Sequence, residues 1–485
     1  MSTVREKKRY DLIVVGAGPA GMAAAIACSK NGARVLVLDE GKSPGGQIYR
    51  SVSTSPFAGD RSLLGDDYFK GEKLVTEFSR SNLEYISTCS VWMVEREADG
   101  SCFGIGVQYS AHSSGETAKS EVFQAKSVLI ATGALERPFP IAGWTLPGVI
   151  TAGAAQTILK SAALVPDGKV VLAGTGPLLY LLAAQFARSG VKIEALLDTT
   201  SFNGMRTALP FAFEFMRSRY FFKGLTILKE VYSKTRVVRG VDTLEAIGPT
   251  KITGVTYRKG SKAHTIKADS LVLHQGVVPQ VNLTMAAGCD HHWNQLRLAF
   301  EPQTGDFAES SIPGIFIAGD NTGIVGADAA EASGAIAAVG ILTYLGLPSN
   351  GIAVESQRSI WSAAMLGRGF IDRFYKPAPQ FRMPGDDVIA CRCEGVTAGT
   401  IREIARNGAQ GPNQAKTFCR SGMGPCQGRL CGLTVSELMA NELNQPVADT
   451  GHYNIRNPVK PITLGSLAAL QKIKPEEEVK AQRLF

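Results

Sequence analysis

The sequence is 485 residues long and lacks the marks of several classes of protein. No long run of lysine and arginine indicates a nucleic-acid-binding face, and 51 basic against 43 acidic residues leave a net charge of +8. The longest apolar stretch, 324–347, contains Asp328 and Glu331, whereas a membrane span needs about 20 apolar residues without such charges. The apolar run 12–15 is too short for a signal peptide. We therefore expect no transmembrane segment, no nucleic-acid partner, and a cytoplasmic location, either free or peripheral at the inner face of the membrane.

Cysteine is scarce over most of the chain and concentrated in one short window. Four of the nine cysteines stand alone: Cys28, Cys89, Cys102 and Cys289. The window holds the other five: Cys391, Cys393, Cys419, Cys426 and Cys431. This distribution excludes a secreted disulfide scaffold, whose cysteines would be spread along a short chain. Disorder is excluded because 45% of the residues are hydrophobic, and the length exceeds the roughly 250–300 residues of a single core, so we expect two or three domains.

A glycine motif lies between two short apolar runs near the N-terminus. It reads Gly16-Ala-Gly18-Pro-Ala-Gly21, and the second run ends at Asp39 and Glu40. This is the order of strand, glycine turn, helix, strand and acid in a dinucleotide-binding βαβ unit. Gly16 permits the tight turn, Gly18 lets the backbone approach a pyrophosphate, and Gly21 lets the helix pack on the strand. Asp39 or Glu40 can accept hydrogen bonds from ribose hydroxyls.

Two later motifs point to a family. An apolar strand at 127–131 closes at Thr132-Gly133, and the segment 314–320, Gly-Ile-Phe-Ile-Ala-Gly-Asp, precedes an Ala/Gly-rich helix. With the glycine turn, these motifs resemble the two-dinucleotide-binding-domain flavoproteins, which include the pyridine nucleotide–disulfide reductases, over roughly the first 345 residues. The resemblance implies an α/β fold with FAD bound. It further implies FAD contacts at Asp320 (ribitol), at Gly46 and Gln47 (isoalloxazine or pyrophosphate) and at Val91 (adenine), with the chain crossing back to this domain at Thr132 and Gly133.

A second strand, glycine turn and helix begin at residue 169. The turn contains Gly174 and Gly176, and Asp198 ends the following strand. The family would carry NAD(P)H in this inserted domain, but Leu179 stands where the third small residue belongs and would displace the helix or crowd the phosphate site. We therefore predict the nucleotide-binding fold, and leave open whether the domain binds NADH, another adenine nucleotide or nothing.

The flavin region lacks the cysteine pair that disulfide reduction needs. Gly45-Gly46-Gln47-Ile-Tyr49 contains no cysteine, and the second domain has none up to residue 288. Because a disulfide reductase holds two cysteines beside its flavin, this activity is excluded. The four isolated cysteines are expected to be small buried residues.

The cysteine window begins with Cys391-Arg-Cys393 and continues, about 30 residues later, with a glycine-rich turn that contains Cys426 and Cys431. Close thiols beside glycines that expose backbone N–H groups suit an iron–sulfur cluster or zinc. Zinc more often uses Cys-x-x-Cys, whereas Cys-x-Cys before a helix resembles the small domain first known from bacterioferritin-associated ferredoxin, which carries [2Fe–2S] on four cysteines. We assign Cys391, Cys393, Cys426 and Cys431 as ligands and Cys419 as a nonligand. The gap between the last two ligands is wider than in that domain, and zinc or a group of buried structural cysteines stays an alternative.

Nearly the whole chain resembles a narrower group, the flavin and iron–sulfur α subunits of multisubunit amine and amino-acid dehydrogenases. The likeness is carried by the cysteine window and by the segments 136–149, 420–429 and 458–466. The group includes the A subunits of octopine and nopaline oxidases, the B subunits of hydrogen cyanide synthases, and the α subunits of D-hydroxyproline and L-proline dehydrogenases. It implies that a partner β subunit with its own flavin oxidises the substrate C–N bond, in some complexes beside a small additional subunit, while this chain accepts or relays electrons.

No constellation for amine oxidation is present in the sequence. His291 and His292 are expected in a solvated loop, and Arg137 pairs either structurally or with a phosphate or carboxylate. We therefore assign no catalytic residue and expect this chain to be the electron-transfer subunit of an opine oxidase or amino-acid dehydrogenase. A stand-alone NADH-dependent flavin and iron–sulfur reductase, and a non-catalytic assembly subunit, are the alternatives.

The expected organisation follows from these motifs. It comprises an FAD-binding domain (1–150 and 280–345), an inserted nucleotide domain (151–279), a linker with one helix (346–385), a [2Fe–2S] domain (386–445) and a docking tail (446–485). Within the tail, the segment 457–463 is expected to dock on a partner or on the chain's own core, and Glu476 to Glu478 are expected to be solvated.

Overall fold

The first domain is an α/β unit built on a seven-stranded sheet. We describe it from a computed structural model, which covers residues 9–110 and 119–470. The strand order is β3-β2-β1-β6-β5-β4, with β19 paired to β6. The strands are β1 (Arg9–Val15), β2 (Val35–Leu38), β3 (Glu84–Ile86), β4 (Cys89–Arg96), β5 (Phe103–Tyr109), β6 (Ser120–Ile130) and β19 (Ile315–Ile317). Strands β3, β2, β1, β6 and β19 pair in parallel, as the dinucleotide-binding pattern predicts, and β5 and β4 add an antiparallel edge.

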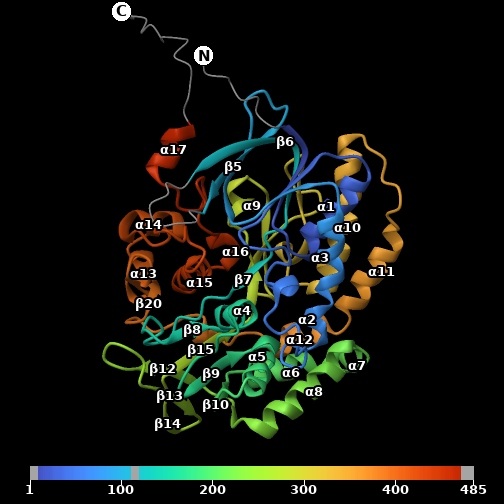
Figure 1. Cartoon of the computed structure of the whole chain (residues 1–485). Helices are drawn as coiled ribbons and strands as arrows, with labels where there is room; N and C mark the ends of the chain where they lie inside the picture. The colour runs from blue at the N-terminus through green and yellow to red at the C-terminus, as the bar shows by residue number, and fades with distance from the viewer. Residues whose placement is uncertain (1–8, 111–118, 471–485) are drawn as a thin grey trace, which may run out of the picture.

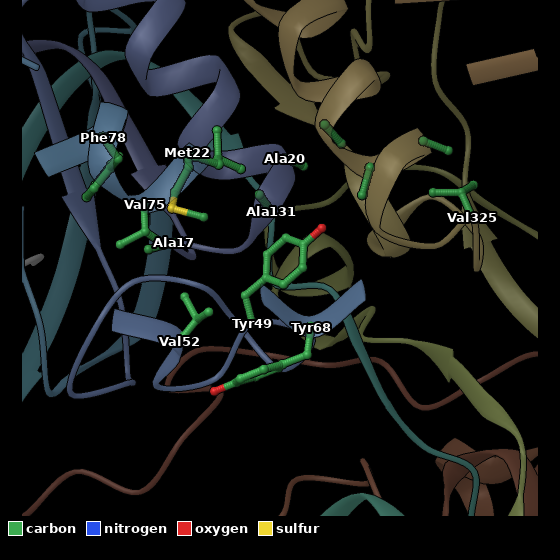
Figure 2. Close-up of a cluster of buried hydrophobic side chains, with 14 of the residues drawn as sticks. Ala17, Ala20, Met22, Tyr49, Val52, Tyr68, Val75, Phe78, Ala131 and Val325 are labelled. Atoms are coloured by element: carbon green, nitrogen blue, oxygen red, sulfur yellow. The ribbon is translucent and has the colours of Figure 1, made fainter. Parts of the chain in front are cut away.

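Helices α1 (Pro19–Lys30), α3 (Gly71–Arg80) and α10 (Ala327–Leu345) cover one face of this sheet (Figure 1). Leu12 and Val14 of β1 point to these helices, whereas Ile13 belongs to the core on the other face. The alanines of α1 and α10 let the two helices lie side by side. Figure 2 shows Tyr49 among the small side chains of this core. The apolar stretch predicted to be a buried helix is α10. None of the described helices is both long and apolar enough to cross a lipid bilayer.

The inserted domain is a second, smaller α/β unit, drawn in green in Figure 1. Its five-stranded sheet has the order β11-β10-β9-β15-β8, and every neighbouring pair is parallel. The strands are β8 (Val149–Thr151), β9 (Val170–Thr175), β10 (Ile193–Asp198), β11 (Val237–Arg239) and β15 (Ser270–Gln275), and the main helices are α4 (Ala152–Ala162), α5 (Pro177–Arg188) and α8 (Arg219–Lys234). The short strands β7 (Ala134–Glu136) and β16 (Val277–Pro279) pair where the chain leaves and re-enters the first domain. The predicted fold of the insertion is therefore present.

The linker contains two helices rather than the single one expected. They are α11 (Val354–Met365) and α12 (Arg368–Phe374). Gly367 separates them with φ of +84°, a left-handed conformation that interrupts a helix and that glycine adopts without steric cost. Helix α11 packs on α10 and α12 packs on α6 (Phe202–Ala208), so the linker runs from the first domain onto the inserted one.

The C-terminal domain is small and mainly helical, and its elements are red and orange in Figure 1. They are β20 (Ile389–Cys391), β21 (Val396–Thr397), α13 (Ala398–Arg406), α14 (Pro412–Cys419), α15 (Gly432–Glu442) and α16 (Val447–Thr450). Tyr453 lies in the same core as Ile401 and Leu438, so the compact part of this domain continues to at least residue 453.

The segment 457–463, which we call the C-terminal strap, docks on the chain's own first domain. The backbone N–H of Val459 donates to the carbonyl of Trp92 at 2.9 Å, and the Asn457 amide donates to Glu95 at 2.9 Å. Val459 is 2% exposed and belongs to the core on the β1, β4 and β5 face of the sheet. Of the two expected docking surfaces, the chain's own core is the one observed. Glu476 to Glu478 lie outside the described residues.

Candidate functional site

A cavity of about 690 Å³ opens at the carboxyl ends of the parallel strands of the first domain. Eleven residues were predicted to contact FAD, and all of them except Gly21 line this cavity. The ten are Gly16, Gly18, Asp39, Glu40, Gly46, Gln47, Val91, Thr132, Gly133 and Asp320. Open α/β sheets bind ligands in the crevice at the carboxyl ends of their strands, where the strand order reverses. The fold and the predicted motifs therefore indicate the same ligand-binding cavity.

Close backbone approaches leave no room for a side chain at two positions of the glycine turn. Gly16 has φ of +107°, and a Cβ added to it would lie 2.4 Å from the carbonyl oxygen of Ala131. Gly21 lies behind the turn, where an added Cβ would come within 1.9 Å of the Gly16 oxygen, so it sets helix packing rather than lining the cavity. Gly18 is the N-cap of α1, and the free N–H groups of that helix end favour an anion.

The three predicted acids differ in how they are held. Asp39 accepts the backbone N–H groups of Ala17 and Gly41, each at 2.6 Å, so it fixes the glycine turn as well as lining the cavity. Glu40 forms an ion pair with Lys460 of the C-terminal strap. Asp320 accepts backbone N–H groups from residues 325 and 326 at 2.8 and 3.0 Å, which orders the chain before α10.

Lys160 of α4 holds the turn that carries Gly46 and Gln47, a contact the sequence did not reveal. Its ammonium donates to the carbonyl oxygens of Gln47 at 3.1 Å and Ile48 at 3.0 Å, and lies 5.5 Å from the centre of the Tyr68 ring. The side chain is 3% exposed. Lys160 therefore joins the inserted domain to the wall of the cavity.

Lys160 gives a pH-dependent prediction. Burial, together with the charge of Arg50, lowers the pKa of Lys160 from 10.5 to about 7. Between these values the unfolded chain binds a proton that the folded chain does not, so stability should rise with pH, by at most about 1.4 kcal/mol per pH unit. We expect the melting temperature of the wild type to rise relative to that of Lys160→Met between pH 7.5 and 9. Parallel changes in both proteins would contradict the assignment.

Glu136 and His274 form a second contact between the domains that sequence reasoning missed. The imidazole Nδ1 of His274 makes a short hydrogen bond with Glu136, and the other carboxylate oxygen of Glu136 accepts the N–H of Gly153 at 2.8 Å. His274 is 2% exposed, whereas Glu136 lines the cavity. In the sequence, the only indication of a role for Glu136 is that it begins one of the segments that carry the family resemblance.

The residues predicted for a second nucleotide lie apart from the cavity. Gly174, Gly176 and Asp198 all stand at the carboxyl ends of strands in the inserted sheet, but none of them lines the cavity. Asp198 is 1% exposed, and its two oxygens accept the hydroxyl of Tyr180 at 2.7 Å and the N–H of Thr200 at 2.8 Å. Leu179, the departure from the glycine pattern, is fully buried in the core.

Four of the five clustered cysteines face one another. The thiol of Cys431 hydrogen-bonds those of Cys391 and Cys426, which lowers the pKa of Cys391 to about 6 and that of Cys426 to about 5. Cys393 is exposed and contacts Cys426. Backbone N–H groups reach these sulfurs from several loop residues: Gly422 and Glu394 to Cys391, Gly428 and Leu430 to Cys426, and Cys426 to Cys393. We call these four side chains the four thiols.

Cys419, predicted as a nonligand, has contacts of its own. Its thiol donates to the carbonyl of Ala415 at 3.2 Å and to the Ser421 hydroxyl at 3.3 Å. Within the described part of the chain, no three His, Cys, Asp or Glu side chains are placed so that they could hold one metal ion. The four thiols are thus arranged as a chain of neighbouring pairs.

The loop 422–431, which we call the cysteine loop, touches the wall of the cavity. The amide of Asn282 donates to the carbonyl of Gln427 at 2.8 Å, and Asn282 itself is 2% exposed and lines the cavity. Arg429 of the same loop also lines the cavity, and its guanidinium donates to the carbonyl of Val459 at 3.3 Å. The cysteine loop and the cavity therefore share a boundary.

Other side chains considered in the sequence are structural. The four isolated cysteines, Cys28, Cys89, Cys102 and Cys289, are buried as predicted. Arg137 is 5% exposed and donates to two backbone carbonyls, those of Arg297 and Leu298. The prediction of a solvated loop was wrong for His291, which lies in β17 (His291–Asn294) and hydrogen-bonds Thr284 at 2.9 Å. Burial lowers its pKa to about 4, so it stays neutral, while His292 is exposed.

Comparison with known proteins places these features in a family. The sequence model of the pyridine nucleotide-disulphide oxidoreductases matches residues 10–334, and that of the sarcosine oxidase A3 domain matches residues 391–471. The opine oxidase A subunit of Agrobacterium tumefaciens (strain Ach5) is 45% identical over 95% of this chain and 92% of its own length. The hydrogen cyanide synthase subunit HcnB of Pseudomonas protegens is 30% identical over 93% of this chain and 96% of its own length.

Solved structures agree on the fold. The crystal structure of L-proline dehydrogenase from P. horikoshii matches 95% of this chain and 80% of its own with a TM-score of 0.70, at 20% sequence identity. These findings confirm the predicted fold of a flavoprotein with two dinucleotide-binding domains, and the resemblance found in the sequence. The chain belongs to the pyridine nucleotide-disulphide oxidoreductase family of flavin oxidoreductases and, within it, to the family of the opine oxidase A subunits.

Proposed function

We propose that this chain is the electron-transferring flavin and iron–sulfur subunit of a multisubunit oxidoreductase that acts on the CH–NH group of an opine such as octopine or nopaline. The cavity would hold FAD and the four thiols would hold [2Fe–2S]. The observation that carries this proposal is the contact of the cysteine loop with the cavity wall, through Asn282 and Arg429. A site for a two-electron carrier and a site for a one-electron carrier share a boundary, as an electron relay requires.

The residues present fit both groups. The glycine turn, the N-terminus of α1 and the acids Asp39 and Asp320 match the polar parts of a dinucleotide. A [2Fe–2S] cluster takes four thiolates, two on each iron, and its sulfurs accept backbone N–H groups, so a chain of thiol pairs with several N–H donors suits it. A zinc site more often uses Cys-x-x-Cys pairs, whereas this chain has Cys391-Arg-Cys393. Bound FAD would take up electron pairs and the cluster would carry single electrons; the chain supplies the cavity, the thiols and their spacing.

A partner subunit follows from the same proposal. The relatives are named as subunits, and the sequence contains no recognisable base and arginine pair for amine binding. We propose that a catalytic flavoprotein β subunit, with a small additional subunit, oxidises the secondary amine to an imine, releasing two electrons and two protons before water cleaves the imine. Large exposed apolar side chains support a hetero-oligomer: Phe202, Leu209, Phe213 and Phe222, on consecutive helical elements of the inserted domain, are 66% to 77% exposed. The cytoplasmic location stays a prediction.

The alternatives are less well supported. The α subunits of proline-type dehydrogenases and hydrogen cyanide synthase fit the same architecture, but the opine oxidase subunit is 45% identical and HcnB 30%. A stand-alone NADH-dependent reductase needs a second nucleotide site. Asp198, the acid that would accept ribose hydroxyls there, is buried and already accepts Tyr180 and Thr200.

One experiment separates these functions. The tagged chain is purified with its natural partners, and flavin absorption and the electron paramagnetic resonance of [2Fe–2S] are recorded without oxygen. We expect octopine or nopaline to reduce the flavin and produce the cluster signal in the complex, whereas NADH should leave the flavin of the isolated chain oxidised. Rapid bleaching by NADH would favour the reductase. Cofactors that no amine reduces in the complete complex would favour an assembly subunit.

A further inference from the structure

Most of the cations that line the cavity come from outside the first domain. Among the described residues, three basic side chains line it: Arg50, Arg429 and Lys460. Only Arg50 comes from the first domain; Arg429 belongs to the cysteine loop and Lys460 to the C-terminal strap. Lys460 already pairs with Glu40, so two cations remain for a ligand.

Arg429 is placed as a ligand-binding residue rather than as half of an ion pair. Its guanidinium donates one hydrogen bond, to the carbonyl of Val459 at 3.3 Å, out of five N–H donors, and none of the carboxylates among the described residues pairs with it. Its side chain is only partly exposed, so solvent screens its charge incompletely. A partly buried guanidinium without a carboxylate is suited to a phosphate, which it can bind through two parallel hydrogen bonds.

The cysteine loop is fixed where Arg429 enters the cavity. Asn282 holds the carbonyl of Gln427, two residues before Arg429, and the strap carbonyl of Val459 holds the guanidinium itself. Lys460, the next residue of the strap, forms an ion pair with Glu40, which lies two residues after the end of β2. The cysteine loop and the C-terminal strap thus close one side of the cavity. The Arg429 guanidinium on this side is held in place by the contacts of Gln427 with Asn282 and of Arg429 with Val459.

From this arrangement we propose that Arg429 is a diphosphate-binding residue of the dinucleotide site, contributed by the C-terminal domain, and that Lys460 positions the strap that holds it. The inference deepens the proposed function, because the only anionic part of FAD is its diphosphate. It makes nucleotide retention depend on the conformation of the loop that carries Cys426 and Cys431. A competing role for Arg429 is to balance the charge of the four thiols, since Cys426 and Cys393 also act on it.

The test uses the full chain after its flavin has been removed and with its cluster retained. Binding of ADP and of adenosine is measured by calorimetry for the wild type, Arg429→Gln and Arg429→Lys, with Arg420→Gln as the matched control. Arg420 lies beside the same loop but is largely exposed and pairs with Glu394 at 3.0 Å. We expect Arg429→Gln to weaken ADP binding on the order of 10- to 100-fold, Arg429→Lys to weaken it less, and adenosine binding to stay unchanged.

Each outcome decides the inference. Unchanged ADP binding with an altered [2Fe–2S] resonance in Arg429→Gln would show that the guanidinium serves the cluster, and would overturn the proposal. Equal loss of ADP and adenosine binding would also overturn it, because a damaged cavity and not a phosphate contact would be the cause. A wild type that binds ADP in an Arg429-dependent way, but never contains flavin, would support this inference while refuting the proposed function.

Discussion

Replacement of Cys393 by serine is expected to abolish the [2Fe–2S] signal of the reduced protein. Cys393 is exposed, so its loss removes little packing, yet it is one of only four thiols that face one another. A serine hydroxyl is a harder ligand than a cysteine sulfur and loses its proton far less readily than a thiol. The bond between iron and the fourth protein ligand is therefore lost. Iron content should fall to a small fraction of the wild-type value, while the melting profile of the flavin domain stays the same. Iron analysis and electron paramagnetic resonance after dithionite measure these effects.

The chain contains a matched control for this variant. Cys419 lies in the same window, is also partly exposed, and contacts Ala415 and Ser421 instead of the four thiols. Cys419→Ser should therefore keep both the iron and the resonance. A cluster that survives Cys393→Ser but not Cys419→Ser would exchange the two assignments, and zinc in place of iron in the purified wild type would refute the iron–sulfur proposal as a whole.

Much of the nucleotide cavity was predictable because its determinants are local in the sequence. The glycine turn, Asp39 and the segment that ends at Asp320 each combine a strand, a turn and a helix start within a few residues, and such patterns indicate backbone conformation directly. The same holds for Cys391 and Cys393, whose spacing alone resembles a known domain. These residues line the cavity or lie among the four thiols in the structure.

The remaining contacts depend on tertiary structure. Lys160 binds the carbonyl of Gln47, which is 113 residues away, and a lysine in an amphipathic helix carries no sign of such a role. Arg429 and Lys460 reach the cavity only because the C-terminal domain and the strap fold back on the first domain. The prediction for His291 was wrong for a related reason. A His-His pair shortly after a glycine suggests a loop, but the segment pairs with β18 (Ala299–Pro302) and the His291 imidazole hydrogen-bonds Thr284.

Replacement of Gly18 by valine should remove the nucleotide without disturbing the fold. Gly18 has φ of −76°, which any residue can adopt, and an added Cβ would meet only the Cα of Gly46, at 3.9 Å. The new side chain would instead project toward the cavity at the N-terminus of α1, where a diphosphate would bind. We expect affinity for FAD to fall at least about 100-fold, corresponding to about 2.8 kcal/mol, and purified protein to lack flavin absorption.

Gly59→Val serves as the matched control, because an added Cβ there meets no atom within 4 Å and the residue is exposed and outside the cavity. Both variants should melt at the temperature of the flavin-free wild type, since neither creates a steric clash. The difference in FAD affinity between the two variants then reports the effect of filling the space beside Gly18. Gly21→Val could not serve this purpose, because its Cβ would collide with the Gly16 oxygen at 1.9 Å and unfold the turn. A Gly18→Val protein that retains stoichiometric flavin would place the cofactor elsewhere. The shared boundary between the cavity and the cysteine loop would then no longer explain electron transfer.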